Sequence, residues 1–175
     1  VAANRLTLEN PGKIILCCDR ATEGKMLNTY YAKTHDAAFV SGVVAGAMSA
    51  RDKVGFMASG FFHTDMTCDI NAFTLGARIV NPRVEVMEYR LTRENDFEEY
   101  AHAVSEFARW GADVAHCLHY LHSPVARKAF PTVYAQSYVL NGERGVIDEC
   151  IGAAAMDWSV FYDSIVGDTI SERGA

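Results

Sequence analysis

The side chains best suited to hold a small molecule are aromatic and polar residues placed after predicted strands. Parallel α/β sheets bind ligands beyond the carboxyl ends of their strands, which selects the loops at residues 59–64, 91–95 and 120–123. Aromatic faces stack on planar rings, while carboxylates and amides pair with polar edges. Each aromatic residue taken alone is more often a core contact, but the set predicts a ligand-binding site made by Ser59, Phe61, Phe62, Asp65, Tyr120 and Gln136.

The histidines do not predict a metal site. His116, His119 and His122 are three residues apart, which would align them on a helix. His116 falls in a predicted strand, however, where an odd spacing alternates between faces. A metal ion needs ligands that converge at about 2 Å, and the neighbouring Cys117 does not change this conclusion. His63 would either contact a ligand or face solvent.

Catalytic signatures are missing from the sequence. It has no phosphate loop, no Gly-x-Gly-x-x-Gly after a strand, no Gly-x-Ser-x-Gly elbow and no His-Glu-x-x-His. Ser59 is followed by glycine, but no base is identifiable beside it. We therefore expect a binding protein that uses no cofactor rather than an enzyme, and an unrecognised α/β enzyme is the alternative.

The elements that must position these residues alternate between strand and helix. Apolar residues at three- and four-residue spacing predict helices, and short apolar runs predict buried strands. The predicted order is helix 36–49, strand 53–58, a helix capped by Thr64 or Asp65 and ended by Asn81-Pro82, strand 84–89, a helix from Asn95 or Asp96 to Gly111, and strand 113–118. Glu99 stands at capping-box distance. Gly42 and Gly46 predict a tight helix-to-sheet contact.

The two ends of the chain are less regular. Residues 1–12 are predicted to be a polar lead-in, and residues 13–18 a buried strand. Ser123-Pro124 predicts a short helix, residues 133–140 and 146–155 two more strands with a turn at Asn141-Gly142, and Asp157 the cap of a last helix. The expected organisation is the end of a first lobe with a crossover (1–52), a second α/β lobe (53–155) and a C-terminal helix (156–175).

The amino-acid composition limits the classes of function that this protein can have. The 175 residues are half apolar, enough for a sizeable core, and the formal charge of −6 argues against direct binding of nucleic acid. No apolar run approaches the roughly 18 residues of a membrane span. Five cysteines are an odd number, which predicts buried reduced thiols rather than a disulfide framework. This cysteine usage favours a reducing compartment.

Three stretches carry a family resemblance: YYAKTHDAAFVSGVVAGAMS, KVGFMAS and INAFTLGARIVNPRVEV, between residues 30 and 86. Together they resemble the core of the basic membrane protein family, the nucleoside-binding lipoproteins of bacterial ABC importers. The resemblance continues more weakly through DFEEYAHAVSEFARWGADV and AAAMDWSVFYDSIV. It therefore spans most of the chain in order.

The resemblance implies an α/β fold with doubly wound parallel sheets, as in type I periplasmic binding proteins, here with the first lobe incomplete. That lobe's usual Asp-Gly-Phe-Asn loop has no counterpart in this sequence. The implied function is binding of a purine nucleoside or base between two lobes for import, with an ABC permease as partner and the cell envelope as location. A cytoplasmic ligand-sensing regulator of the same fold is the alternative.

Overall fold

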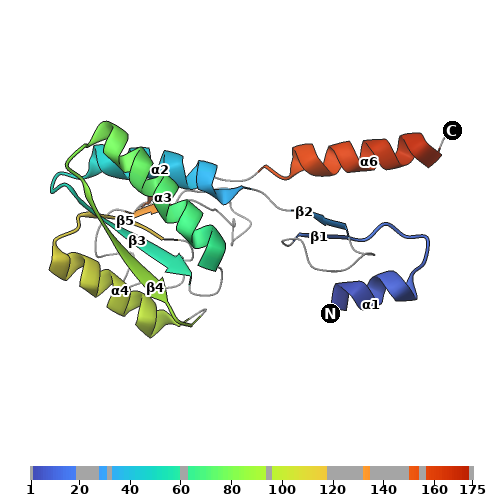
Figure 1. Cartoon of the computed structure of the whole chain (residues 1–175), viewed down its shortest axis with the longest axis horizontal. Helices are drawn as coiled ribbons and strands as arrows, with labels where there is room; N and C mark the ends of the chain where they lie inside the picture. Colours follow the sequence, from blue (N-terminus) through green and yellow to red (C-terminus); the bar gives the residue numbers. More distant parts are fainter. Residues whose placement is uncertain are drawn as a thin grey trace. The chain divides into compact units, whose positions relative to one another are not determined.

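The computed structural model describes residues 2–18, 28–30, 33–59, 63–93, 96–117, 132–134, 150–153 and 157–173. The chain divides into two compact units, Val1–Lys33 and Thr34–Ala175. Figure 1 shows the elements of both units. The division falls between Lys33 and Thr34, and the predicted lobe organisation, with the first lobe and its crossover ending at residue 52, stays a prediction.

The first unit contains a helix that the sequence did not predict. The segment Ala2–Glu9 forms α1, where a polar lead-in was expected. An ion pair joins Arg5 to Glu9 at 2.6 Å, and the Asn10 side chain donates to the carbonyl of Leu6 at the end of the helix. Gly12 follows with φ 91°, a conformation that glycine adopts without strain. The helix has only eight residues, which are too few for helical periodicity to be recognised in the sequence.

Two short strands complete the first unit. Strand β1 (Leu16–Cys18) pairs in parallel with β2 (Asn28–Tyr30). The predicted strand at residues 13–18 is therefore shorter than expected, and it is not fully buried, because Ile14 and Cys18 are exposed.

The cysteines only partly follow the prediction. Cys117 is buried as expected, but Cys18 and Cys68 are exposed and Cys17 is half-buried. No disulfide joins these four described thiols. The expectation of buried thiols was therefore wrong for Cys18 and Cys68.

The second unit is built on a five-stranded parallel sheet. Its strands are β3 (Lys53–Ser59), β4 (Glu85–Leu91), β5 (Val114–His116), β6 (Thr132–Tyr134) and β7 (Cys150–Ala153). Their spatial order is β4-β3-β5-β6-β7, and all four pairings are parallel. Strand β4 thus lies outside β3 at one side of the sheet, while β6 and β7 lie outside β5 at the other side. This is a doubly wound sheet with its switch point between β3 and β5, which confirms the predicted α/β fold class.

Helices cover both faces of this sheet. Figure 1 shows α2 (Thr34–Met48) and α3 (His63–Val80) together on one face and α4 (Phe97–Trp110) on the other. The last helix is α6 (Ser159–Arg173). All four were predicted, with ends that differ by a few residues. No helix in the described ranges is long and apolar enough to cross a membrane.

Helix ends follow the predicted capping chemistry at several places. Asp96 accepts hydrogen bonds from the backbone N–H groups of Glu98 and Glu99 at the start of α4, and Gly111 ends it with φ 97°. Asp157 accepts a hydrogen bond from the N–H of Ser159 at 2.9 Å. Hydrogen bonds from the Ser159 side chain and backbone hold the pKa of Asp157 below its usual value.

The central strand β3 divides the core into two clusters because its side chains alternate between faces. Val54, Phe56 and Ala58 pack under α2 and α3. Met57 packs on the α4 face with Phe107. Each fully buried side chain of the size of Met or Phe stabilises the fold by about 1.5–3 kcal/mol, so β3 is the main anchor of both layers.

Glycines let α2 and α3 approach backbone to backbone. A Cβ added at Gly42 would collide with the carbonyl oxygen of Phe73, and one at Gly46 would lie 2.5 Å from the carbonyl oxygen of Ala77. The predicted close contact is therefore present, but its partner is helix α3 and not the sheet. Because residue 42 faces 73 and residue 46 faces 77, the two helices run parallel.

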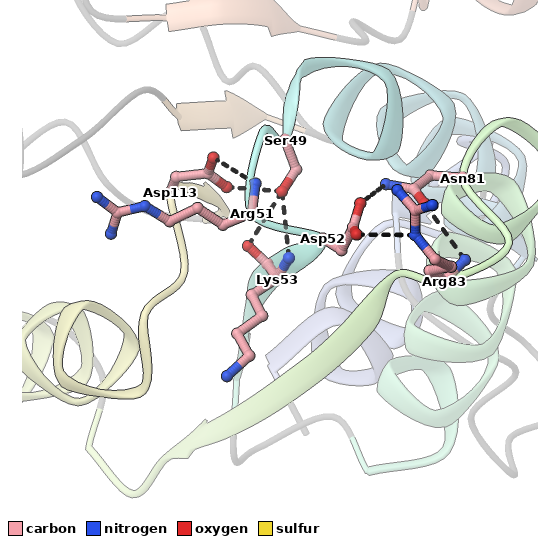
Figure 2. A network of polar contacts seen from close by, with 7 residues as sticks. All are labelled: Ser49, Arg51, Asp52, Lys53, Asn81, Arg83 and Asp113. Carbon is pink, nitrogen blue, oxygen red and sulfur yellow. Dashed lines mark hydrogen bonds and ion pairs between the residues drawn. The ribbon is translucent and has the colours of Figure 1, made fainter.

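A polar network ties the start of β5 to the α2–β3 turn (Figure 2). The Asp113 carboxylate accepts hydrogen bonds from Ser49 Oγ at 2.6 Å and from the N–H groups of Ala50 and Arg51 at 2.7 and 3.1 Å. Ser49 Oγ also accepts from the N–H of Lys53 at 3.2 Å. This network lies at the amino edge of the sheet, opposite the edge where a ligand is expected.

The second half of this network is built around Asp52, which has φ 58°. Its carboxylate accepts from Asn81 Nδ2 at 2.7 Å and from Arg83 Nε at 3.0 Å, and both hydrogen bonds lower the pKa of Asp52. Its carbonyl accepts from the N–H of Glu85 at 2.8 Å. The amino ends of β3 and β4 are thereby held in register.

Replacing Asp113 with alanine is expected to destabilise the second unit by about 1–2 kcal/mol, because three donors lose a charged acceptor. Urea unfolding at pH 7 measures the effect. Asp168, an exposed carboxylate on α6, provides the control, and its alanine variant should stay within about 0.5 kcal/mol of wild type. Equal midpoints for the two variants would contradict the assigned role of Asp113.

Candidate ligand-binding site

The sheet topology places the candidate site at the carboxyl ends of β3 and β5. Strand β3 ends at Ser59 and β5 at His116, and the two strands are hydrogen-bonded neighbours with Phe56 opposite His116. They flank the switch point, which is where doubly wound sheets usually bind their ligands. The loops after β3 and β5 are therefore the first candidates for ligand contact.

The predicted site residues are only partly within the described structure. Ser59 is the last residue of β3, and Asp65 is the third residue of α3. The backbone thus brings these two positions to the carboxyl edge, on either side of the loop that follows β3. Phe61, Phe62, Tyr120 and Gln136 lie outside the described residues. The six-residue set remains a prediction.

A buried hydrogen bond joins the starts of α2 and α3 near the same edge. Thr34 Oγ1 donates to the carboxylate of Asp69, with distances of 2.8 and 2.9 Å to its two oxygens. Both side chains are buried. Sequence analysis missed this pair, although Asp69 gave a signal: it is a carboxylate one turn from Phe73, on the core-facing side of an amphipathic helix.

The loop after β4 is held by a carboxylate. Glu99 accepts hydrogen bonds from Thr92 N and Oγ1, both at 2.8 Å, and from Arg93 N at 3.0 Å. Burial would raise the pKa of Glu99, but the bonds from Thr92 and Arg93 outweigh it and keep the pKa low. The predicted capping box is thus half right: Asp96 caps α4, while Glu99 reaches back to the preceding loop. These bonds hold the backbone of Thr92 and Arg93 directly after the carboxyl end of β4.

His116 is the most unusual polar residue at this edge. Its ring has no exposed surface, stacks flat on Phe56 with centroids 4.4 Å apart, and meets the edge of Phe73 at 5.2 Å. Neither ring nitrogen has a hydrogen-bond partner among the residues that the structure describes. Burial lowers the pKa of His116 to about 3, against a weak opposing effect of its own backbone. The imidazole is therefore neutral at physiological pH.

The described residues at this edge do not form a metal site. Burial raises the pKa of the Cys117 thiol, so the residue beside His116 stays protonated and is a poor metal ligand. Within the described ranges, no three His, Cys, Asp or Glu side chains gather closely enough to hold a metal ion. His119 and His122 lie outside those ranges.

A doubly wound parallel sheet with a ligand edge at its switch point is the architecture of one lobe of a periplasmic-binding-protein-like fold. A solved structure supports this class: an ABC transporter solute-binding protein from Conexibacter woesei DSM 14684 superposes with a TM-score of 0.57 over 75% of this chain and 46% of its own, at 18% identity. At that identity the likeness shows the fold alone.

The family follows from the sequence. The family model for PnrA-like ABC transporter substrate-binding proteins matches residues 2–168, and the chain belongs to that family. This confirms the predicted resemblance. The chain is also 30% identical over 95 residues to the metabotropic glutamate receptor-like protein G of Dictyostelium discoideum, which covers 54% of this chain and 12% of that protein. The chain thus spans less than half the length of either relative.

Proposed function

We propose that this chain binds a purine nucleoside or base as the solute-binding component of an ABC importer at the cell envelope. The observation that carries the proposal is the switch point between β3 and β5 in a member of the PnrA-like substrate-binding family. In this proposal Phe61 and Phe62 stack on the purine ring. Asp65 and Gln136 pair with polar groups of the base or ribose.

Binding by a two-lobed protein of this class shifts a population of conformations. A ligand that makes additional contacts when two lobes close favours the closed form in proportion to those contacts. An importer then recognises the closed form. Neither step requires chemical conversion of the ligand, so the nucleoside should be recovered unchanged after incubation with the protein.

Calorimetric titration of the 175-residue chain with adenine, adenosine, guanosine and inosine tests the proposal. We expect saturable binding of at least one of them with a Kd near 1 μM, or roughly −8 kcal/mol. Phe62→Ala should weaken it about tenfold or more, because stacking of a base on an aromatic ring contributes about 1–3 kcal/mol. Leu75→Ala, at an exposed position on α3, is the matched control. No heat with any of the four ligands on a folded sample would refute the proposal.

A ligand-sensing use of the same site is a second candidate. It is favoured by the similarity to a protein named as receptor-like, and it keeps the proposed ligand while replacing the permease with a signalling partner. Mass spectrometry of the native protein separates the two uses. A lipid-modified cysteine that follows a cleaved leader supports import, whereas a fused cytoplasmic or signalling segment supports sensing.

A further inference from the structure

His116 lies in the core, although burial of its polar ring nitrogens destabilises the folded protein. Both ring nitrogens are buried and lack hydrogen-bond partners within the described part of the chain. A buried donor or acceptor without a partner has lost its bonds to water and gained nothing in exchange. Such orphaned groups are few in native proteins and call for a specific explanation.

Packing alone does not require a histidine at this position. The ring lies parallel to Phe56, with an interplanar angle of 2°, and edge-on to Phe73. Phe56 and Phe73 also meet edge to face at 5.1 Å. A phenyl ring at residue 116 would keep these aromatic contacts and would remove both orphaned nitrogens. Packing in the surrounding core therefore does not explain why residue 116 is a histidine.

The position of His116 in the sheet suggests a role in the ligand site. It is the last residue of β5, opposite Phe56 of β3 and Val133 of β6 in the sheet register. It thus stands at the switch point, under the carboxyl edge where a ligand is expected. Asp69 of α3 lies one turn before Phe73, and its carboxylate accepts hydrogen bonds from Thr34.

We infer that His116 is a positioning residue of the ligand site, whose neutral ring gains a hydrogen bond only in the ligand-bound arrangement of the carboxyl edge. A neutral imidazole offers one donor and one acceptor, so an ordered water, a loop backbone group or the ligand can complete it. A bond formed only in the bound state adds to affinity, because it offsets a penalty present in the free protein. This inference rests on the proposed function.

The test combines stability and affinity in one pair of variants. His116→Phe should melt about 2–4 °C or more above wild type in the absence of ligand. It should also bind the tightest of adenosine, guanosine and inosine at least tenfold more weakly. His116→Gln keeps a donor and an acceptor, so it should retain affinity closer to wild type. Val114→Ala, on the same strand and core face, should lower the melting temperature and leave the Kd unchanged.

An NMR experiment distinguishes a role of His116 in ligand binding from a purely structural role. In protein labelled with ¹⁵N-histidine, the ring nitrogens of residue 116 should shift on addition of the bound nucleoside, whereas a purely structural ring would not respond. A His116→Phe variant with unchanged affinity would overturn the inference. So would a His116→Phe variant that is no more stable than wild type, because the unpaired nitrogens would then carry no penalty in the free protein. Wild type that binds none of the nucleosides would instead overturn the proposed function and this inference with it.

Discussion

Alanine at Gly42 is expected to destabilise the second unit by roughly 1–3 kcal/mol, the usual range for overpacking. The added Cβ would overlap the carbonyl oxygen of Phe73, which is backbone and cannot rotate away. Alanine also gains about 1 kcal/mol of helix propensity over glycine, so the measured cost is what remains after that gain. Urea unfolding, compared with wild type at the same pH, gives the value.

Gly167 provides the matched control because it is also a helical glycine, in α6, and a Cβ added there would meet nothing within 4 Å. Gly167→Ala should leave stability unchanged or raise it by up to about 1 kcal/mol. Gly76→Ala should behave as Gly42→Ala does, since its Cβ would collide with the carbonyl of Phe39 from the other helix. If Gly42→Ala were as stable as Gly167→Ala, the close approach of α2 and α3 would be disproved.

This helix contact also connects packing to the candidate site. The two helices run parallel, so separating them at Gly42 would displace their amino ends, where Thr34 bonds to Asp69. Both ends lie toward the carboxyl edge of the sheet. We therefore expect Gly42→Ala to weaken nucleoside binding as well as folding.

The central alternation could be predicted from sequence because its signals are local. The stretch from α2 to α4 combines helical periodicity, short apolar strands and strong stops at Asn81-Pro82 and Gly111. Each of these signals is confined to a few neighbouring residues. The helix α1 was not predicted because its eight residues are fewer than the roughly 11–18 over which helical periodicity is recognised.

Long-range partners could not be predicted in the same way. Gly42 and Gly46 predicted a close contact, but only the structure shows that their partner is α3 and not the sheet. Glu99 stood at the right spacing for a capping box, yet the loop after β4 offers it three donors instead. At the site, the strand-end rule indicated three loops, and only the strand order singles out those after β3 and β5.

Stability should fall as the pH is lowered from 7 toward 5, because of His116. The unfolded chain takes up a proton on this residue near its ordinary pKa of 6.5, while burial keeps the folded pKa at about 3. Below pH 6.5 the unfolded state therefore binds more protons than the folded state, and the free energy of unfolding drops by up to about 1.4 kcal/mol per pH unit. The contribution is complete above pH 6.5 and is lost progressively down to about pH 3, roughly 3–5 kcal/mol in all.

The groups around the ring offer little to offset this loss. Phe56 of β3 and Phe73 of α3 pack on it and do not ionise, and Asp69 one turn further along α3 holds Thr34. The lowered pKa values of Asp52, Glu99 and Asp157 act in the same direction but only near and below pH 4. The window between pH 7 and 5 therefore isolates histidine titration.

His116→Phe is the variant that assigns the effect, because it removes the titrating group and leaves the other five histidines in place. Urea unfolding at pH 7, 6 and 5 should show wild type losing about 2 kcal/mol more than the variant across this range. Parallel pH profiles for the two proteins would mean that His116 is protonated in the folded state as easily as in the unfolded chain. That result would contradict the observed burial of the ring, whose nitrogens have no partner among the described residues.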